Sequence, residues 1–201
     1  MSIDWDKHQR EELLFWKGFY NRRLAILSHT DFFEMIYRCF CKSIHHKSFK
    51  RTLEIGTGGS GGFLAVIQRM KDLYSLDTLN DTLRKAHFLP YTAHINYVQG
   101  FAEKMPFRDD FFSLVIMANT LDHVQDMKQV VSEVKRVLHP KGILLFQTYL
   151  NVKNPHPFTF HNQEEIYKMI DMPVIEEHLV TDNPKWRNRN DYYVGIFRNK
   201  K

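Results

Sequence analysis

A carboxylate and a cluster of glycines form the part of the chain best suited to chemistry. Glu54 ends a short apolar stretch, and five glycines follow within residues 56–62. Glycines let the backbone take positive φ values and let a ligand approach the main chain. Residues 63–70 are predicted to form a helix, whose first amides have no intrahelical partner and favour a carboxylate or a phosphate. The stretch therefore predicts a strand, a tight turn and a helix that can bind a small charged ligand.

A second carboxylate, Asp77, is expected beside this turn. It ends another apolar stretch, residues 73–77, and it follows Gly56 by 21 positions. The carboxyl ends of two parallel strands joined by a helix lie side by side, so Asp77 should reach the glycines. A carboxylate there can accept hydrogen bonds from both hydroxyls of a ribose. The alternative is that Asp77 caps a helix starting near Leu79, although residues 80–81 offer a cap as well.

The spacing of Gly56, Gly58 and Gly61 satisfies the dinucleotide-binding pattern G-x-G-x-x-G, which alone is weakly specific. Glu54 distinguishes between two possible cofactors, because a carboxylate two positions before the first glycine can bind an ammonium group. A nicotinamide dinucleotide has no such group, whereas the methionine part of S-adenosylmethionine has one. The segment L-E-I-G-T-G-G-S-G resembles the E/D-x-G-x-G motif of class I S-adenosylmethionine-dependent methyltransferases. A glycine-rich turn without a ligand is the alternative.

Later segments resemble the methyltransferase-11-type subfamily in the right order. Residues 100–107 and 109–115 are similar to its G-D-A-x-x-L-P-F and F-D-x-V segments, with Phe101 in place of the usual acid after the glycine. Residues 119–124 resemble its L-x-H-V turn, and residues 140–142 resemble its P-G-G turn. A nicotinamide-binding chain is not expected to have these two turns, so the joint pattern favours the methyltransferase interpretation.

The resemblance implies an α/β fold with a Rossmann-like, seven-stranded, mostly parallel sheet, an antiparallel last strand and helices on both faces. We expect a single methyltransferase domain over residues 1–201, with an N-terminal helical lid or cap at 1–48 and the Rossmann-like core at 49–201. Pro140 is expected to stop a helix, and Gly142 to permit the reversal into the next strand. After the glycine turn, strands are predicted at 73–77, 95–98, 112–118, 143–149, 174–181 and 192–198, and helices at 127–138 and 163–170.

Residues 8–46 are unusually aromatic and show helical spacing. Residues 28–31 are predicted to form the break between two helices, with Thr30 or Asp31 as the N-cap of the second. The segment either covers one edge of the sheet or forms a lid whose aromatic side chains line the acceptor pocket. Both roles remain open, and one segment can have both.

The resemblance also assigns the site residues. His123 follows the strand predicted at 112–118 and is the first candidate for a general base if the acceptor is a hydroxyl or a protonated amine. The alternative is a histidine that hydrogen-bonds the backbone of its own turn. The expected cofactor-binding residues are Glu54, Gly56, Thr57, Gly58, Gly59, Ser60, Asp77, Thr78, Phe101, Ala102 and Asn119. The expected acceptor-binding residues are Trp16, Tyr20, His123, Tyr149, His156 and His161.

The composition of the chain argues against several classes of protein. A hydrophobic content of 43% and an aromatic content of 14% argue against disorder. No apolar run is long enough for a membrane helix, and the polar, acidic start is unlike a secretory signal. The net charge of +5 is spread along the chain in small clusters. This pattern favours ordinary solvated charge over a nucleic-acid-binding surface.

The two cysteines, Cys39 and Cys41, are expected to be reduced thiols in a cytoplasmic protein. Positions two apart on a helix point to different faces, so the pair is poorly placed for a disulfide. Together with His45 and His46 they match no zinc-binding spacing, and no metal is expected.

The expected function is transfer of a methyl group from S-adenosylmethionine, the expected cofactor, to an O, N or C atom of a small molecule or a carrier-linked biosynthetic intermediate. One alternative is a non-catalytic accessory or regulatory protein of the same fold that binds the cofactor. Another is methylation of nucleic acid or protein. We expect a small-molecule acceptor as the partner, no membrane span and no nucleic acid, and we allow for a homodimer.

Overall fold

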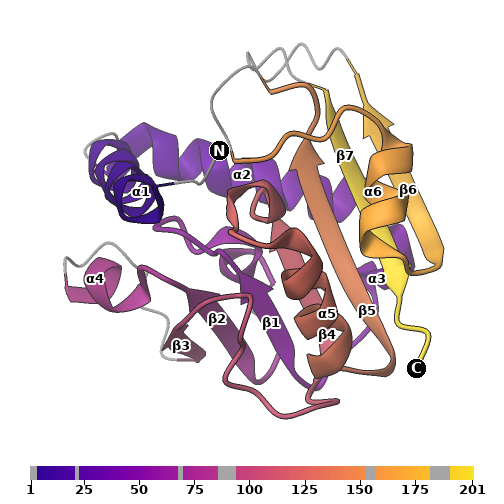
Figure 1. The fold of residues 1–201 in the computed structure, drawn as a ribbon. Helices are drawn as coiled ribbons and strands as arrows, with labels where there is room; N and C mark the ends of the chain where they lie inside the picture. Colours follow the sequence, from indigo (N-terminus) through magenta and orange to yellow (C-terminus); the bar gives the residue numbers. More distant parts are fainter. Residues whose placement is uncertain (1–3, 21–22, 68–69, 86–93, 153–156, 182–190) are drawn as a thin grey trace.

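A seven-stranded sheet forms the centre of the computed structural model (Figure 1). Its strand order is β3-β2-β1-β4-β5-β7-β6; neighbours among β1 to β5 pair in parallel, and β7 is antiparallel to both β5 and β6. The structure describes residues 4–20, 23–67, 70–85, 94–152, 157–181 and 191–201, and of residues 20 and 23–29 the backbone only. The strands are β1 (Thr52–Ile55), β2 (Leu73–Asp77), β3 (Ile95–Gln99), β4 (Phe112–Ala118), β5 (Leu138–Tyr149), β6 (Val174–Val180) and β7 (Tyr192–Arg198).

Helices cover both faces of this sheet, which confirms the expected architecture. Figure 1 shows α5 and α6 in front of the sheet and α2 behind it. Buried residues of α2, α3 and η1 pack on one face, and those of η2, α5 and α6 pack on the other. The α-helices are α1 (Trp5–Tyr20), α2 (Arg23–Phe40), α3 (Lys42–His45), α4 (Asn80–Lys85), α5 (Met127–Val137) and α6 (Gln163–Ile170), and the 3-10 helices are η1 (Gly62–Ala65) and η2 (Leu121–His123).

β4 shows why the sheet needs cover on both sides. Successive side chains of a strand point to opposite faces. Val115 and Met117 therefore join the core on the α5 side, whereas Leu114 and Ile116 join the core on the α2 side. All four side chains are buried, which explains why residues 114–118 of this strand are continuously apolar rather than alternating.

The carboxyl ends of β1, β2 and β4 meet at one edge of the sheet. Ile55 of β1 is level with Leu76 of β2 and Met117 of β4. The backbone N–H of Gly56 then donates to the carbonyl of Leu76 at 2.8 Å. This register brings the glycine turn, Asp77 and the turn after β4 to the same edge, as the sequence predicts.

The predicted break between the first two helices is wrong. Residues 28–31 lie inside α2, so neither Thr30 nor Asp31 is an N-cap. The next turn of the helix buries Phe33 and Ile36 against the sheet. This packing outweighs the modest helix propensities of Ser, His and Thr, from which the break was predicted.

The helix predicted at 63–70 is also wrong, because the described residues form only the short η1. The N–H of Val66 bonds to the carbonyl of Phe63 at 2.9 Å, a bond of the 3-10 type. Val66 and Ile67 are both β-branched, which disfavours a longer α-helix here.

The turn predicted at residues 140–142 lies inside β5, which follows α5 directly, and it differs from the prediction in two ways. β5 begins earlier than expected, because Leu138 already pairs with Phe112. The residue in the left-handed conformation is Lys141, with φ of 63°, and not Gly142. Gly142 is needed for close approach instead, since a Cβ there would lie 2.8 Å from the carbonyl oxygen of His139.

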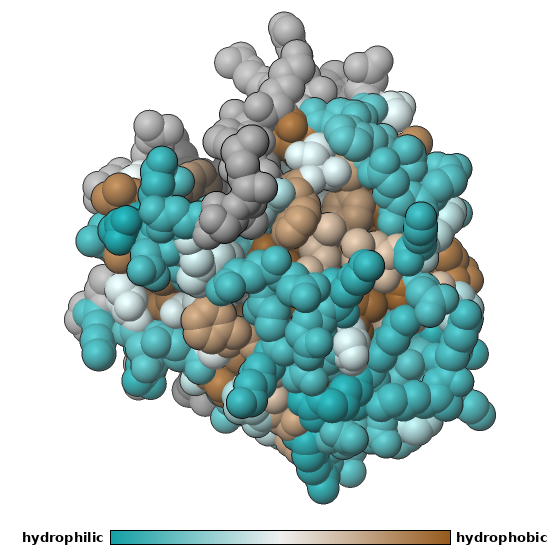
Figure 2. Space-filling model, in the orientation of Figure 1, coloured by the Kyte–Doolittle hydropathy of each residue, from teal (hydrophilic) through white to brown (hydrophobic). Residues whose placement is uncertain are grey.

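The surface is mostly polar on the face that Figure 2 shows. Apolar side chains also reach the surface on α1, where Leu14 and Phe15 are 65% and 57% exposed. Within the part of the chain that the structure describes, no helix combines the length and the apolar character that crossing a bilayer requires.

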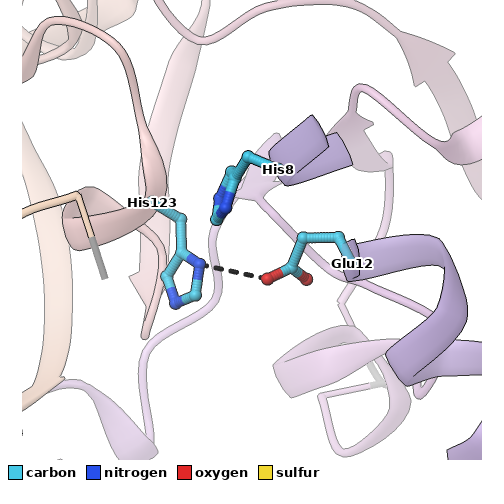
Figure 3. A group of neighbouring side chains, drawn as sticks. All are labelled: His8, Glu12 and His123. Atoms are coloured by element: carbon cyan, nitrogen blue, oxygen red, sulfur yellow. Dashed lines mark ion pairs between the residues drawn. The ribbon is translucent and has the colours of Figure 1, made fainter. Parts of the chain in front are cut away.

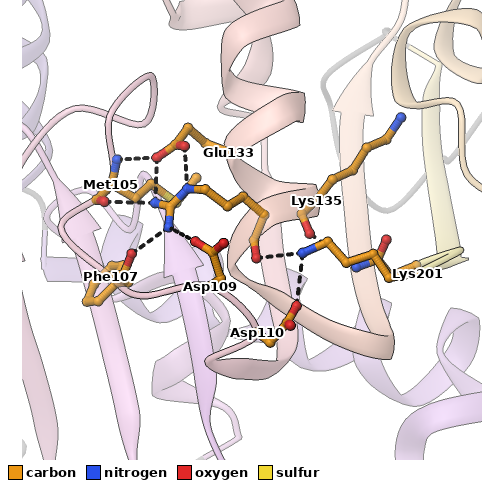
Figure 4. A network of polar contacts seen from close by, with 9 residues as sticks. Met105, Phe107, Asp109, Asp110, Glu133, Lys135 and Lys201 are labelled. Atoms are coloured by element: carbon orange, nitrogen blue, oxygen red, sulfur yellow. Dashed lines mark hydrogen bonds and ion pairs between the residues drawn. The ribbon is translucent and has the colours of Figure 1, made fainter.

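Arg136 of α5 bonds to the loop that follows β3. Figure 4 shows the loop residues Met105, Phe107 and Asp109 beside Glu133 of α5. The guanidinium of Arg136 donates to both carboxylate oxygens of Glu133 at 2.6 and 2.8 Å and to Asp109 at 2.8 Å. It also donates to the carbonyls of Phe107 and Met105 at 2.7 and 3.1 Å. Glu133 accepts from the N–H of Met105 at 2.7 Å, and its bond to Arg136 lowers the pKa of the Glu133 carboxyl. The loop after β3 therefore rests on α5.

We expect Arg136→Lys to lower the free energy of unfolding by about 1–3 kcal/mol. Lysine keeps the charge but cannot reproduce the planar fork of donors, and it leaves carbonyl groups of the loop without a partner. Urea denaturation measures the change, with the exposed Lys128→Met on the same helix as control. Equal unfolding midpoints for the two variants would contradict this role of Arg136.

Candidate cofactor and acceptor site

Glu54 is a buried carboxylate that holds the glycine turn in place. It lies in β1 and is 1% exposed. One carboxylate oxygen accepts from the N–H of Phe63 and the other from the N–H of Leu64, both at 2.9 Å. Burial raises the pKa of Glu54 to about 8, although these two hydrogen bonds lower it, and the negative charge of Asp77 raises it further. The two acids are thus close enough to act on one another.

Two glycines of the turn are required by close contacts. Gly62 has φ of 53°, and a Cβ there would lie 2.2 Å from Oε1 of Glu54. Gly58 has φ of 55°, and a Cβ there would lie 2.0 Å from the indole of Trp16 on α1. Any other residue would strain the backbone at both positions and collide with a side chain.

Both carboxylate oxygens of Asp77 accept hydrogen bonds from the main chain, and its binding of a ribose stays a prediction. Oδ2 accepts from the N–H of Gly58 at 3.0 Å, and Oδ1 accepts from the N–H of Leu79 at 2.8 Å. Asp77 therefore lies against the glycine turn and also satisfies the backbone just before α4. Burial raises the pKa of its carboxyl.

Amide side chains with buried polar atoms lie near the carboxyl ends of β4 and β5. The backbone N–H of Asn119 donates to the carbonyl of Gln147 at 2.8 Å, and Asn119 has φ of 51°. Oδ1 of Asn119 and both amide atoms of Gln147 are buried with no hydrogen-bond partner among the residues described here. Because an unsatisfied buried polar atom destabilises a fold, such atoms point to a bound molecule that completes them.

α1 crosses this edge and contacts each segment predicted to bind the cofactor. Thr78, which follows Asp77, donates to Gln9 at 2.5 Å, and the ring of Trp5 lies 6.4 Å from that of Phe101. The other two contacts join Trp16 to the glycine turn and Glu12 to His123. The N-terminal helix therefore lies over the site, as a lid would.

His123 lies in η2, and its ring faces Glu12 of α1 (Figure 3). Nδ1 is 3.2 Å from Glu12, and Nε2 is 3.8 Å from Asp122. Burial disfavours the charged ring, but the hydrogen bond to Glu12 and the charge of Asp122 raise the pKa of His123 overall. The ring of His8 lies 5.6 Å away, centroid to centroid.

The remaining cofactor residues predicted from sequence take varied positions. The hydroxyl of Thr57 bonds to that of Ser75 at 2.7 Å, and the hydroxyl of Ser60 accepts from the N–H of Gly62 at 3.4 Å. Ala102 is buried in the core, whereas Phe101 is 47% exposed. Their binding roles stay predictions.

The residues predicted to bind the acceptor do not lie together at one place in the structure. Tyr149 packs on Phe32 and Tyr192 beneath α2. Nδ1 of His161 lies 3.0 Å from Oδ1 of Asn151, and the backbone N–H of His161 donates to Glu165 of α6. Both contacts favour a structural role in that loop. His156 and the side chain of Tyr20 lie outside the described residues.

Sequence reasoning missed His8, Glu12 and Gln147. His8 and Glu12 lie four residues apart on one helix face, a spacing that the sequence displays but that has no meaning until His123 is beside it. Gln147 was detectable as an amide inside the apolar strand 143–149.

Comparison with known families agrees with this geometry. Residues 53–146 match the model of the methyltransferase-11 family, described as a methyltransferase domain. The fold and this match together place this part of the chain among class I S-adenosylmethionine-dependent methyltransferase domains.

Individual relatives are more distant. The chain is 30% identical over 138 residues to the ubiquinone/menaquinone biosynthesis C-methyltransferase UbiE of Pasteurella multocida, covering 65% of this chain and 50% of the relative. It is 31% identical over 100 residues to a mitochondrial 2-methoxy-6-polyprenyl-1,4-benzoquinol methylase of Xenopus laevis, covering 50% of this chain and 31% of the relative. The chain thus spans half or less of the length of these relatives.

Solved structures share the fold at low sequence identity. The N-methyltransferase NodS of Bradyrhizobium japonicum, in complex with S-adenosyl-L-homocysteine, has a TM-score of 0.67 at 16% identity, covering 85% of this chain and 87% of NodS. A methyltransferase-like protein from Bacillus halodurans has a TM-score of 0.67 at 18% identity, covering 82% of this chain and 99% of that protein.

Proposed function

We propose that the chain transfers a methyl group from S-adenosylmethionine to an O, N or C atom of a small molecule or a carrier-linked intermediate. The observation that carries the proposal is the pair of acids at one sheet edge. Glu54 accepts hydrogen bonds from Phe63 and Leu64, where the glycine turn meets η1. Asp77 accepts one from Gly58 within the turn. The methyltransferase-domain match over residues 53–146 supports it.

The residues of the site have distinct roles in this proposal. Asp77 accepts hydrogen bonds from the ribose hydroxyls, since each of its oxygens has a lone pair beyond the one used by Gly58 or Leu79. Glu54 fixes the turn through Phe63 and Leu64 and supplies the negative charge opposite the amino group of the cofactor. The bound sulfonium supplies an activated methyl group, so the protein mainly aligns the acceptor and excludes water.

The acceptor is the least constrained part of the proposal. The named relatives include a benzoquinol methylase, so hydroxylated aromatic compounds are the first class to screen. His123 is the group we place against the acceptor, with Glu12 orienting its ring. Detection of any methylated product would remove the alternative of a non-catalytic cofactor-binding protein.

Partners and location belong to the proposal as well. We place the protein in the cytoplasm, acting on a small molecule and without a nucleic-acid partner. The domain organisation, with a lid at 1–48 and a core at 49–201, and a homodimeric assembly are part of the same proposal.

Calorimetry tests the cofactor site directly. We expect S-adenosylmethionine or its demethylated product to bind the purified chain, and Asp77→Ala to weaken binding at least tenfold, which corresponds to about 1.4 kcal/mol. Asp81→Ala is the control, because Asp81 is a nearby acid whose carboxylate pairs with Arg84 on the same helix. No heat with either ligand, together with clear binding of a nicotinamide dinucleotide, would reject the proposal.

Trp16→Ala tests the lid. The indole fills the space against Gly58, so it has to move before a ligand can approach the main chain there. We expect the variant to bind the cofactor faster, because a smaller fraction of molecules holds the site closed. Stopped-flow kinetics measure the association rate of the cofactor in Trp16→Ala, with the exposed Phe15→Ala as control. Slower association in Trp16→Ala would mean that the indole packs on the bound cofactor instead.

Gln147→Leu is expected to change the stability of the fold and the methyl-transfer activity in opposite directions. An apolar side chain removes the buried amide that has no partner among the described residues, so we expect the free energy of unfolding to rise by about 1 kcal/mol or more. Turnover of a methyl acceptor should fall, because the amide is no longer there to bind it. Exposed Gln125→Leu is the control. A loss of stability in Gln147→Leu would show that the amide is satisfied within the fold.

A further inference from the structure

Three side chains that commonly bind metals meet beneath α1 (Figure 3). His8 and Glu12 come from successive turns of α1, and His123 comes from η2, far away in the sequence. One ligand atom from each lies within 4.8 Å of the others. Helix geometry places residues i and i+4 on one face, so the packing of α1 on the sheet edge presents both of its side chains to His123.

We propose that His8, Glu12 and His123 bind one divalent first-row transition-metal ion, with zinc as the first candidate. Two imidazole nitrogens and one carboxylate oxygen form a donor set that suits zinc and its neighbours in the series. Bonds of about 2.0–2.2 Å place the donors of a tetrahedral zinc roughly 3.3–3.6 Å apart. Small rotations of side chains close the observed separation to that value.

His8 supplies independent support. Its Nε2 is buried and has no hydrogen-bond partner among the residues that the structure describes. An ion would accept the lone pair of this nitrogen and would compensate the charge of Glu12 at the same time.

Asp122 completes the arrangement from the other side of His123. It is 2% exposed, and Oδ2 lies 3.8 Å from Nε2, while Nδ1 faces Glu12. A carboxylate behind a metal-bound histidine fixes the ring and its tautomer, as it does in many metal sites. The geometry therefore assigns Nδ1 to the ion, and Nε2 lies on the side of Asp122.

The site has two consequences for the molecule. The ion joins α1 to the turn after β4, so it fastens the lid over the sheet edge. Three protein ligands also leave a position open for water or for a hydroxyl or amine group of a bound molecule. The metal site does not depend on cofactor binding, since its ligands are separate from the glycine turn and from Asp77. With the ion bound, His123 and Glu12 are ligands, and His123 no longer acts as the base placed against the acceptor.

This site was not predicted from the sequence. The expectation of no metal rested on Cys39, Cys41, His45 and His46, which lie close together in the sequence. The three ligands proposed here become neighbours only through the packing of α1.

Cobalt binding tests the proposal. The full chain is stripped with a chelator and titrated with Co²⁺, and its ligand-field absorption is followed. We expect one Co²⁺ per chain that Zn²⁺ displaces. His8→Ala, Glu12→Gln and His123→Ala should each weaken binding by about 100-fold or more, because each removes a ligand. The matched controls are Glu11→Gln, on the exposed side of the same helix, and His46→Ala, an exposed histidine.

A second readout guards against misfolded variants. Zn²⁺ should raise the Tm of the wild type and of both controls but not that of the three ligand variants, and each metal-free variant should keep the wild-type circular dichroism. Binding of S-adenosylmethionine, measured in parallel, separates a failed metal site from a failed cofactor site. Absence of Co²⁺ binding by the wild type, or wild-type affinity in His8→Ala and Glu12→Gln, would overturn the proposal.

Discussion

The bonds from the carboxylate of Glu54 to the N–H groups of Phe63 and Leu64 are the constraint on which the site depends. They turn the chain back immediately after β1, and they leave no room for a side chain at Gly62. A buried acid is costly to hold in this way, and its raised pKa of about 8 expresses that cost. A positively charged ligand group beside it would favour the ionised form, so the turn is better matched to a bound cation than to an empty pocket.

Much of the fold could be predicted because its signals are local. β2, β4, β7 and α6 have the predicted bounds, since each combines a clear apolar pattern with a stop such as Asp77 or with a cap such as Asn162, whose side chain accepts from Glu165. In a parallel sheet, segments at the carboxyl ends of neighbouring strands share one edge. The glycine turn after β1, the acid at the end of β2 and the turn after β4 are such segments, so the sequence predicts that they lie together. These relations need no knowledge of tertiary contacts beyond the topology.

The predictions from sequence were wrong or incomplete where contacts between distant parts of the chain determine the structure. The continuous helix through residues 28–31 is stabilised by the burial of Phe33 and Ile36, which no local pattern reports. The site was incomplete for the same reason. His123 was found from its place after β4, but its partners on α1 depend on how a helix from the other end of the chain crosses the sheet.

That crossing makes α1 the element that links the separate parts of the site. A ligand that reaches the main chain at Gly58 and the indole of Trp16 cannot occupy the same space. The position of α1 and cofactor binding are therefore coupled, and the contacts of Gln9 and Glu12 with the core set the free energy that a ligand has to overcome. The same helix exposes Leu14 and Phe15 on its outer side. These two side chains are already in water, so displacing the helix costs no hydrophobic free energy from them. The energetic resistance to opening thus comes from its polar inner contacts and from Trp16, which are the contacts that a bound ligand could replace.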